Sequence, residues 1–150
     1  MPSTKSTIIT AITFLAFSLA GQAAPLGITS GQQLQKQAES ETTDISTEAL
    51  QKMLDNELEM VLIDIRTTDE VSNMGGTIDA TQNAIIPRGW LEFRASKVAQ
   101  NKNTPIVVYC GAGIRSPLAA KTLQDMGYTN VQNYSDGFLG WRKAGLSVKK

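Results

Sequence analysis

Two short apolar runs constrain what this 150-residue chain can fold into. Residues 60–63 (Met-Val-Leu-Ile) and residues 106–109 (Ile-Val-Val-Tyr) are apolar throughout, and both contain β-branched side chains. A strand with one face in water alternates apolar and polar residues, so these runs predict strands that are buried on both faces. Such strands are typical of parallel sheets that are covered by helices.

Segments with helical spacing alternate with these strands. Ser46 is a favourable N-cap, and the apolar residues Leu50 and Leu54 lie four positions apart, on one helical face. The remaining segments predict helices near residues 68–74, 90–98, 118–126 and 138–143 and strands near residues 84–86 and 131–134. This alternation predicts an α/β sandwich with a mainly parallel central sheet, in one domain over residues 44–150.

A polar segment, residues 24–43, precedes this domain. It is rich in Gln, Ser, Thr and Glu and contains no aromatic side chain. We expect a linker or a mobile arm, with room for a short helix over residues 32–39.

The first residues are similar to an export signal. Lys5 precedes a largely apolar run over residues 8–20, and the small residues Gly21 and Ala23 suit the positions before a cut. The run is shorter than the ~20 residues that span a bilayer as a helix. We therefore expect residues 1–23 to be removed as a signal peptide, which leaves a periplasmic or secreted protein without stable membrane insertion. An uncleaved anchor and a buried core helix are the alternatives.

The composition narrows the chemistry. The chain has no histidine, a single cysteine (Cys110), and 14 acidic and 14 basic residues. One cysteine without histidine builds neither a zinc–thiolate site nor an internal disulfide, so we expect no metal. Zero net charge without a basic run argues against nucleic acid as a partner.

Cys110 begins the most informative segment, because it directly follows the second apolar strand. Ligands of parallel sheets bind beyond the carboxyl ends of the strands. Gly111 and Gly113 allow the backbone to curl, so that its N–H groups form an anion-binding nest at the start of the next helix. Ser116 suits the N-cap of that helix, and Pro117 suits its first position.

A thiolate is a natural guest of such a nest, because helix N-termini and nearby cations lower the pKa of a thiol. Arg115 can add a permanent charge or brace the loop. The predicted site comprises the catalytic residues Cys110 and Arg115 and the substrate-binding residues Gly111, Ala112, Gly113, Ile114 and Ser116. A thiolate here can take sulfur from a donor as a persulfide without a general base or a separate cofactor. The alternative is that Cys110 is a small buried apolar residue.

Residues from about 44 to 148 resemble a single rhodanese domain of the thiosulfate sulfurtransferase family, as an exported bacterial member. The matching motifs are Asp64-Ile65-Arg66, Gly76-Thr77-Ile78, Ile86-Pro87, the Cys110–Arg115 loop, Gly137-x-x-x-Trp141 and Ala144-Gly145-Leu146. The resemblance implies a three-layer sandwich with helices on both faces of the sheet. It also implies a persulfide on Cys110, a small sulfur donor, and a thiol, cyanide or protein acceptor.

The sequence departs from the family pattern at several positions. Thr77 stands in place of the usual histidine, and Asp136 replaces a glycine. Gly111 and Ala112 lie where members that use thiosulfate often carry cationic side chains, which leaves the donor open. We expect Asp64 and Arg66 to support the loop as an ion pair or hydrogen-bond network, with a direct role in the site as the alternative.

Two other functions fit parts of this pattern. A non-catalytic rhodanese-like module would bind a partner in the periplasm, but such a scaffold has no need of the Cys110 thiol. A cysteine phosphatase or arsenate reductase has a similar loop. The resemblance to that broader group implies five residues between cysteine and arginine, whereas four separate Cys110 from Arg115.

We predict that the mature chain begins near Ala24 and is released in soluble form. The expectation follows from the short apolar run and from the small residues before the cut. Intact-mass spectrometry of the exported protein measures the new terminus. Recovery of the full-length chain in the membrane fraction would contradict cleavage.

Overall fold

The computed structural model describes residues 27–56 and 58–150, so the expected signal peptide and its cut lie outside the described residues. The helices are α1 (Gly31–Glu41), α2 (Thr47–Asp55), α3 (Thr68–Asn73), α4 (Leu91–Val98), α5 (Ser116–Asp125) and α6 (Gly137–Lys143), with a 3-10 turn, η1, at Arg88–Trp90. The strands are β1 (Thr43–Asp44), β2 (Val61–Asp64), β3 (Thr77–Ile78), β4 (Asn83–Ile85), β5 (Ile106–Tyr109), β6 (Val131–Asn133) and β7 (Val148–Lys149).

Five strands form one parallel sheet in the order β1-β6-β5-β2-β4. The two apolar runs of the sequence are neighbours at its centre, where Asp64 at the end of β2 pairs with Tyr109 at the end of β5. This arrangement confirms the predicted α/β fold. A second, antiparallel pair, β3 with β7, was not predicted, because strands of two residues carry no periodic signal.

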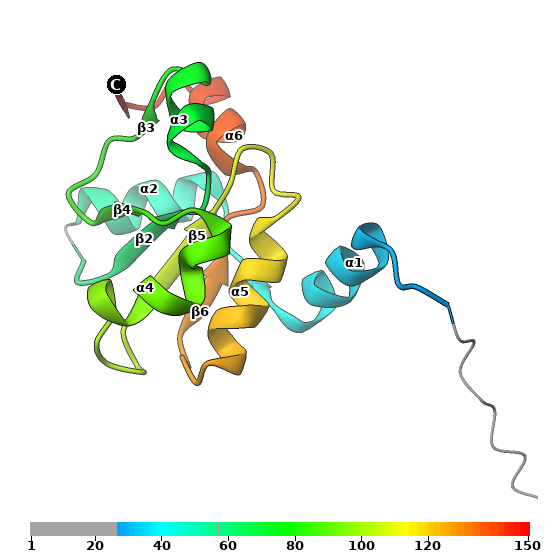
Figure 1. Ribbon diagram of the computed structural model, residues 1–150. Helices are drawn as coiled ribbons and strands as arrows, with labels where there is room; N and C mark the ends of the chain where they lie inside the picture. The colour runs from blue at the N-terminus through cyan, green and yellow to red at the C-terminus, as the bar shows by residue number, and fades with distance from the viewer. Residues whose placement is uncertain (1–26, 57) are drawn as a thin grey trace, which may run out of the picture.

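Helices cover both faces of the sheet (Figure 1), and the side chains of β5 point alternately into two cores. Ile106 and Val108 point into a core that α4 and α5 complete. Val107 and Tyr109 point into a core on the opposite face, which α2 and α6 complete. The result is the expected three-layer sandwich, in which each residue of β5 is buried on one side of the sheet or the other.

The segment expected to be a linker or mobile arm, residues 24–43, is largely a packed helix in its described part. It forms α1, which lies against α5, and it runs into β1 at Thr43, one residue before the predicted start of the domain. A capping box starts the helix: the Gln33 N–H donates to Ser30 Oγ (3.2 Å), and the Ser30 N–H donates to Gln33 Oε1 (2.8 Å). The short helix allowed for over residues 32–39 is confirmed, but the polar composition gave no sign of its packing, because Ala38 is the buried residue through which α1 packs.

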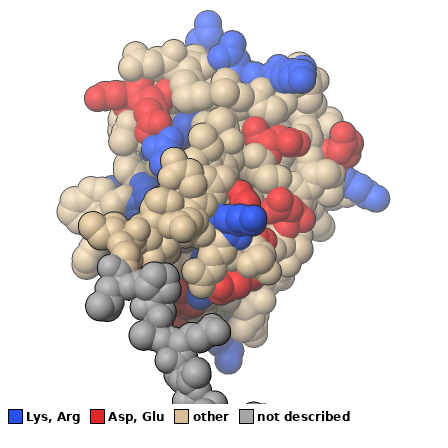
Figure 2. Space-filling view, turned by 90° about the vertical axis from the view of Figure 1, so that its right-hand side faces the viewer, with Lys and Arg blue, Asp and Glu red and all other residues tan. Residues whose placement is uncertain are grey.

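Charged side chains are mixed over the surface. Figure 2 shows acidic and basic residues interspersed on the face that it presents, in keeping with the balanced composition of the chain. Over residues 27–56 and 58–150, no helix has both the length and the apolar character that are needed to cross a bilayer.

A fully buried ion pair lies at the carboxyl end of β2. The Arg66 guanidinium donates to the Asp64 carboxylate through Nη2 (2.6 Å) and Nε (2.9 Å), and neither side chain is exposed. Nη2 also donates to the Gly76 carbonyl (2.9 Å), and the guanidinium lies 4.0 Å from the centre of the Phe138 ring. The pair therefore links the end of β2 to the start of β3 and to α6.

We predict that Asp64→Ala lowers the free energy of unfolding by about 3–5 kcal/mol, because it leaves the Arg66 guanidinium buried without its counter-ion. Urea unfolding followed by circular dichroism measures the loss. As a control, Asp125→Ala removes one of the two acidic partners of Lys121 at the surface, where an ion pair contributes about 1 kcal/mol or less. Equal effects of the two substitutions would contradict the structural role of the buried pair.

Candidate active site

Cys110 lies at the carboxyl edge of the sheet, directly after β5, where the sequence predicts it. Only 1% of the residue is exposed, so its sulfur lies at the bottom of the loop that runs to Arg115. Burial alone is compatible with the view that Cys110 is merely a small apolar residue. The polar groups around the sulfur decide between the two interpretations.

Helix α6 fixes the orientation of the loop backbone. The Phe138 N–H donates to the Cys110 carbonyl and the Leu139 N–H donates to the Gly111 carbonyl, both at 2.9 Å. Because the N–H and C=O of one peptide point in opposite directions, these bonds turn the N–H groups of the same peptides toward the inside of the loop. The first residues of α6 thus determine where the N–H groups of Gly111 and Ala112 point.

Two glycines permit this close approach between α6 and the loop. Gly137 has φ +61°, and a Cβ there would lie 2.8 Å from the carbonyl oxygens of Cys110 and Gly111. Gly113 has φ +75°, and a Cβ there would collide with the carbonyl of Ser135. Any larger residue at either position pushes the loop away from the neighbouring backbone.

The surroundings of Cys110 stabilise its thiolate form. Burial by itself raises the pKa of the thiol, but the backbone N–H groups of Arg115, Ser116 and Ala112 and the Ser116 hydroxyl outweigh it, so that the pKa lies below its ordinary value. An apolar pocket would produce the opposite shift. The loop is therefore a thiolate-binding nest of the kind that the sequence predicts.

The predicted role of Ser116 as an N-cap is wrong. Arg115 occupies that position, without a capping side chain, and Ser116 is the first residue of α5. The fully buried Ser116 hydroxyl instead lies 3.8 Å from the Cys110 sulfur. The hydroxyl is thus available to the sulfur because the N–H groups at the start of α5 point at the thiolate and need no cap.

The rim of the loop carries no charged side chain before Arg115. Ala112 and Ile114 are exposed there, whereas Gly111 and Gly113 are buried. Behind the loop, a Cβ at Gly111 would lie 3.2 Å from the end of the Met74 side chain and 3.9 Å from Arg66 Cδ. Gly111 therefore lets Arg66 and Met74 pack directly beneath the loop.

Arg115 does not point freely into the site. Its Nη2 donates to Glu70 Oε1 (2.6 Å) and its Nη1 donates to Glu70 Oε2 (3.0 Å), which is a two-bond ion pair between the loop and α3. The Glu70 carboxylate is the main reason that the pKa of Arg115 is raised, and the Cys110 thiolate contributes further. Arg115 thus braces the loop while it remains within electrostatic reach of the sulfur.

The departures from the family pattern have structural explanations. Thr77 Oγ1 donates to Asp64 Oδ2 (2.8 Å) and lies 2.8 Å from the Tyr109 hydroxyl, so it joins the network of the buried ion pair. Asp136 accepts a hydrogen bond from the Thr47 hydroxyl (2.9 Å) at the start of α6. Both side chains support the elements that hold the loop.

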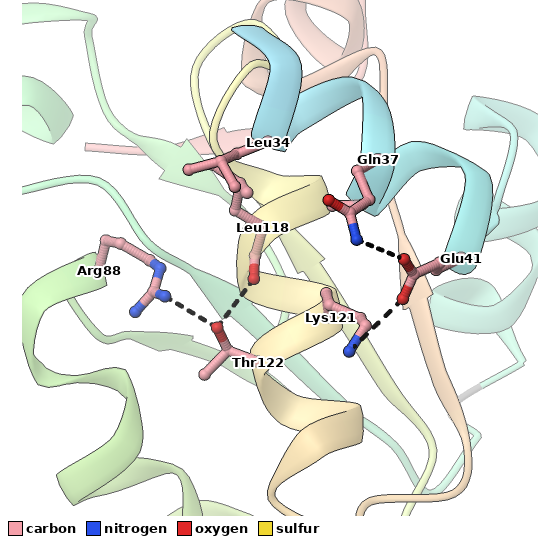
Figure 3. A pocket seen from close by; sticks show the side chains of 8 residues that line it. Leu34, Gln37, Glu41, Arg88, Leu118, Lys121 and Thr122 are labelled. Carbon is pink, nitrogen blue, oxygen red and sulfur yellow. Dashed lines mark hydrogen bonds and ion pairs between the residues drawn. The ribbon is translucent and has the colours of Figure 1, made fainter. Parts of the chain in front are cut away.

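A separate groove of about 410 Å³ lies between α1 and α5 (Figure 3). Its polar groups already pair with one another: Arg88 donates to Thr122 Oγ1 (2.8 Å), and Glu41 accepts from Gln37 (3.1 Å) and lies 3.5 Å from Lys121 Nζ. None of its lining residues belongs to the Cys110 loop. The groove is therefore distinct from the candidate active site.

Comparison with known families agrees with this fold. A family model described as the rhodanese-like domain matches residues 46–144. The chain belongs to the rhodanese-like domain family. The match includes the Cys110 loop, α3 and α6, whereas α1 lies before the rhodanese-like domain.

Relatives of this rhodanese-like domain include sulfurtransferases. A sulfurtransferase of Allochromatium vinosum is 31% identical over 105 residues, which are 70% of this chain and 92% of the relative. The polysulfide-sulfur transferase of Wolinella succinogenes has a similar structure, with TM-score 0.67 and 31% identity over 76% of this chain and 82% of that one. A Rhodopseudomonas palustris protein of unknown function, described as a possible tyrosine phosphatase, has TM-score 0.72 and 31% identity over 85% of this chain and all of that one.

Several residues that shape the site were not predicted from the sequence. Glu70 binds Arg115 from a different element, and the only sequence signal was the Thr67-x-x-Glu70 capping box. The N–H groups of Phe138 and Leu139 act through the backbone, so their side chains give no signal. Met74 contacts the loop through the space that Gly111 leaves, which depends on the tertiary fold.

We predict that Ser116→Ala raises the pKa of the Cys110 thiol and slows its alkylation near neutral pH by up to about tenfold. The reason is the loss of a hydrogen bond to a charged group, while the backbone N–H donors remain. Alkylation rates with iodoacetamide over a pH series measure the shift. Ser135→Ala removes an exposed hydroxyl from the adjacent loop and serves as the control. If the alkylation rate of folded Ser116→Ala depends on pH in the same way as that of the wild type, the Ser116 hydroxyl does not stabilise the thiolate.

Proposed function

We propose that the protein is a sulfurtransferase that carries one sulfur atom on Cys110 as a persulfide. The observation that carries the proposal is the nest of N–H donors from Ala112, Arg115 and Ser116 around a buried cysteine sulfur, which lowers the pKa of the thiol despite its burial. The sulfurtransferases among its relatives support the same reaction class.

The transfer takes place in two displacement steps. The Cys110 thiolate attacks the outer sulfur of a donor, a new S–S bond forms, and the bond from that sulfur to the rest of the donor breaks. The remainder of the donor leaves with the bonding electron pair. A thiolate or cyanide acceptor then attacks the outer sulfur of the persulfide, and the Cys110 thiolate is restored. Neither step needs an external oxidant, a metal or a proton acceptor.

The shape of the loop favours a slender donor. Cys110 is 1% exposed, and the side chains on the rim, Ala112 and Ile114, are uncharged. A sulfane sulfur extends as a single atom from its carrier and can reach down to the thiolate. From the signal predicted for residues 1–23, we further propose that the donor and the thiol, cyanide or protein acceptor meet the enzyme outside the cytoplasm.

A phosphatase is the second candidate, because a Rhodopseudomonas palustris protein of similar structure is described as a possible tyrosine phosphatase. Two features of this chain argue against that reaction. The loop from Cys110 to Arg115 has one residue fewer than the phosphatase pattern, and the Arg115 guanidinium is occupied by Glu70. A tetrahedral oxyanion needs donors about 2.7–3.1 Å from its charge on several sides.

We predict that the protein gains the mass of one sulfur atom after incubation with a sulfane donor and loses it to cyanide or a thiol. Cys110→Ser abolishes both steps, because a serine hydroxyl is far less nucleophilic than a thiolate. Intact-mass spectrometry before and after addition of the acceptor measures both transfers. The folded Cys110→Ser protein is the control for sulfur bound elsewhere.

The wild type and the Cys110→Ser variant also distinguish sulfur transfer from the two competing functions. A wild-type protein that takes up no sulfur from any donor would favour the alternative of a non-catalytic binding module. Turnover of an aryl phosphate that depends on Cys110 would overturn the preference for sulfur chemistry over phosphorus chemistry.

A further inference from the structure

Among residues 27–56 and 58–150, Glu70 is the one acidic residue that forms an ion pair with the Cys110 loop, and its position is fixed independently of that loop. It closes the capping box of α3: the Glu70 N–H donates to Thr67 Oγ1 (3.2 Å), and the Thr67 N–H donates to Glu70 Oε2 (3.1 Å). The capping box of α3 therefore orients the Glu70 carboxylate independently of its ion pair with Arg115. A carboxylate held in this way presents both oxygens to the guanidinium fork.

The ion pair is formed throughout the neutral pH range. The hydrogen bond from Arg115, followed by the hydrogen bond from the Thr67 N–H, lowers the pKa of Glu70 to about 2. The two side chains are 35% and 42% exposed, so the pair lies at the surface of the loop and not beneath it. An approaching donor thus meets a positive and a negative charge together.

The loop itself carries no other charged side chain. Arg115 is the only cationic residue between Cys110 and the start of α5, and the positions from Gly111 to Ile114 have no ionisable side chain. With Glu70 in place, the cationic charge near the sulfur is compensated, and a donor with two negative charges gains little attraction. The fixed N–H dipoles of the nest interact with the reacting sulfur and with no other part of the donor.

We propose that Glu70 is a specificity-determining residue, which acts through Arg115 to select sulfane donors with at most one negative charge, such as an alkyl hydropersulfide, over dianionic thiosulfate. This inference rests on the proposed sulfur transfer. Glu70 itself does not contact the donor. It positions the guanidinium and cancels its charge.

Alkylation of Cys110 tests the charge directly, without any transfer activity. Iodoacetate is anionic and iodoacetamide is neutral, and both react with the same thiolate, so a change in thiol pKa cancels in the ratio of their rate constants. Glu70→Gln leaves Arg115 uncompensated and raises the ratio of iodoacetate to iodoacetamide rates by about five- to tenfold at low salt. The effect shrinks at 1 M salt, where the Debye length is about 3 Å.

Two control variants distinguish the effect of the Glu70–Arg115 ion pair from the effect of any nearby negative charge and from a change in the geometry of the loop. Asp69→Asn removes the same charge from the adjacent exposed position, which forms no ion pair in the described part of the chain, and changes the ratio by less than about twofold. Glu70→Asp keeps a negative charge beside Arg115, so its ratio stays closer to the wild type than that of Glu70→Gln. If Glu70→Asp and Glu70→Gln behave alike, the effect is one of loop geometry and the inference fails.

The donor preference gives the second measurement. For each variant, kcat/KM is determined with thiosulfate and with an alkyl hydropersulfide. Glu70→Gln raises the preference for thiosulfate by at least the factor seen in alkylation, whereas Asp69→Asn leaves it unchanged. An unaltered alkylation ratio in folded Glu70→Gln overturns the role of Glu70, even where sulfur transfer proceeds. If the wild type takes sulfur from neither donor, the proposed function fails, and the alkylation result stands separately.

Discussion

Two backbone hydrogen bonds, from the Phe138 and Leu139 N–H groups to the Cys110 and Gly111 carbonyls, fix the orientation of the first peptides of the loop. The peptide that presents its carbonyl to Leu139 has its N–H on the residue Ala112, and that N–H is one of the donors to the Cys110 sulfur. The outward bond and the inward bond are thus two ends of one rigid peptide. Without α6 at this distance, the Ala112 N–H would not be held toward the sulfur, and fewer donors would oppose the rise in thiol pKa that burial causes.

The position of α6 depends in turn on the buried pair at the end of β2. The Arg66 guanidinium lies over the Phe138 ring, and its carboxylate partner, Asp64, also accepts from Thr77. Trp141 anchors the far side of α6 by packing edge-on against Tyr134 at 6.4 Å between ring centres. A chain of contacts therefore runs from the centre of the sheet through α6 to the loop. This series of contacts gives the fully buried Asp64–Arg66 pair a role in holding the loop.

The sequence predicted the sheet centre and the nest because their signals are local. The apolar run over Ile106–Tyr109 needs burial on both faces, and Gly111 and Gly113 mark a tight backbone turn. It did not predict the packing of α1, whose buried surface is a single alanine, or the pairing of Glu70 with Arg115. That pair joins residues 45 positions apart, and nothing in either local sequence specifies the partner. The Ser116 N-cap failed for a related reason, since the sulfur of Cys110 takes the place that a capping side chain would fill.

A site without histidine is consistent with the charge balance of the proposed transfer. The thiolate of Cys110 and the persulfide formed from it each carry one negative charge, so the loop holds the same charge before and after sulfur is taken up. Fixed N–H dipoles from Ala112, Arg115 and Ser116 serve both forms equally, and no group has to gain or lose a proton between the steps. A titrating base would add a charge that varies with pH beside an anion that needs a constant environment. The compensated Arg115–Glu70 pair at the rim preserves the same constancy, because its net charge is zero in both states.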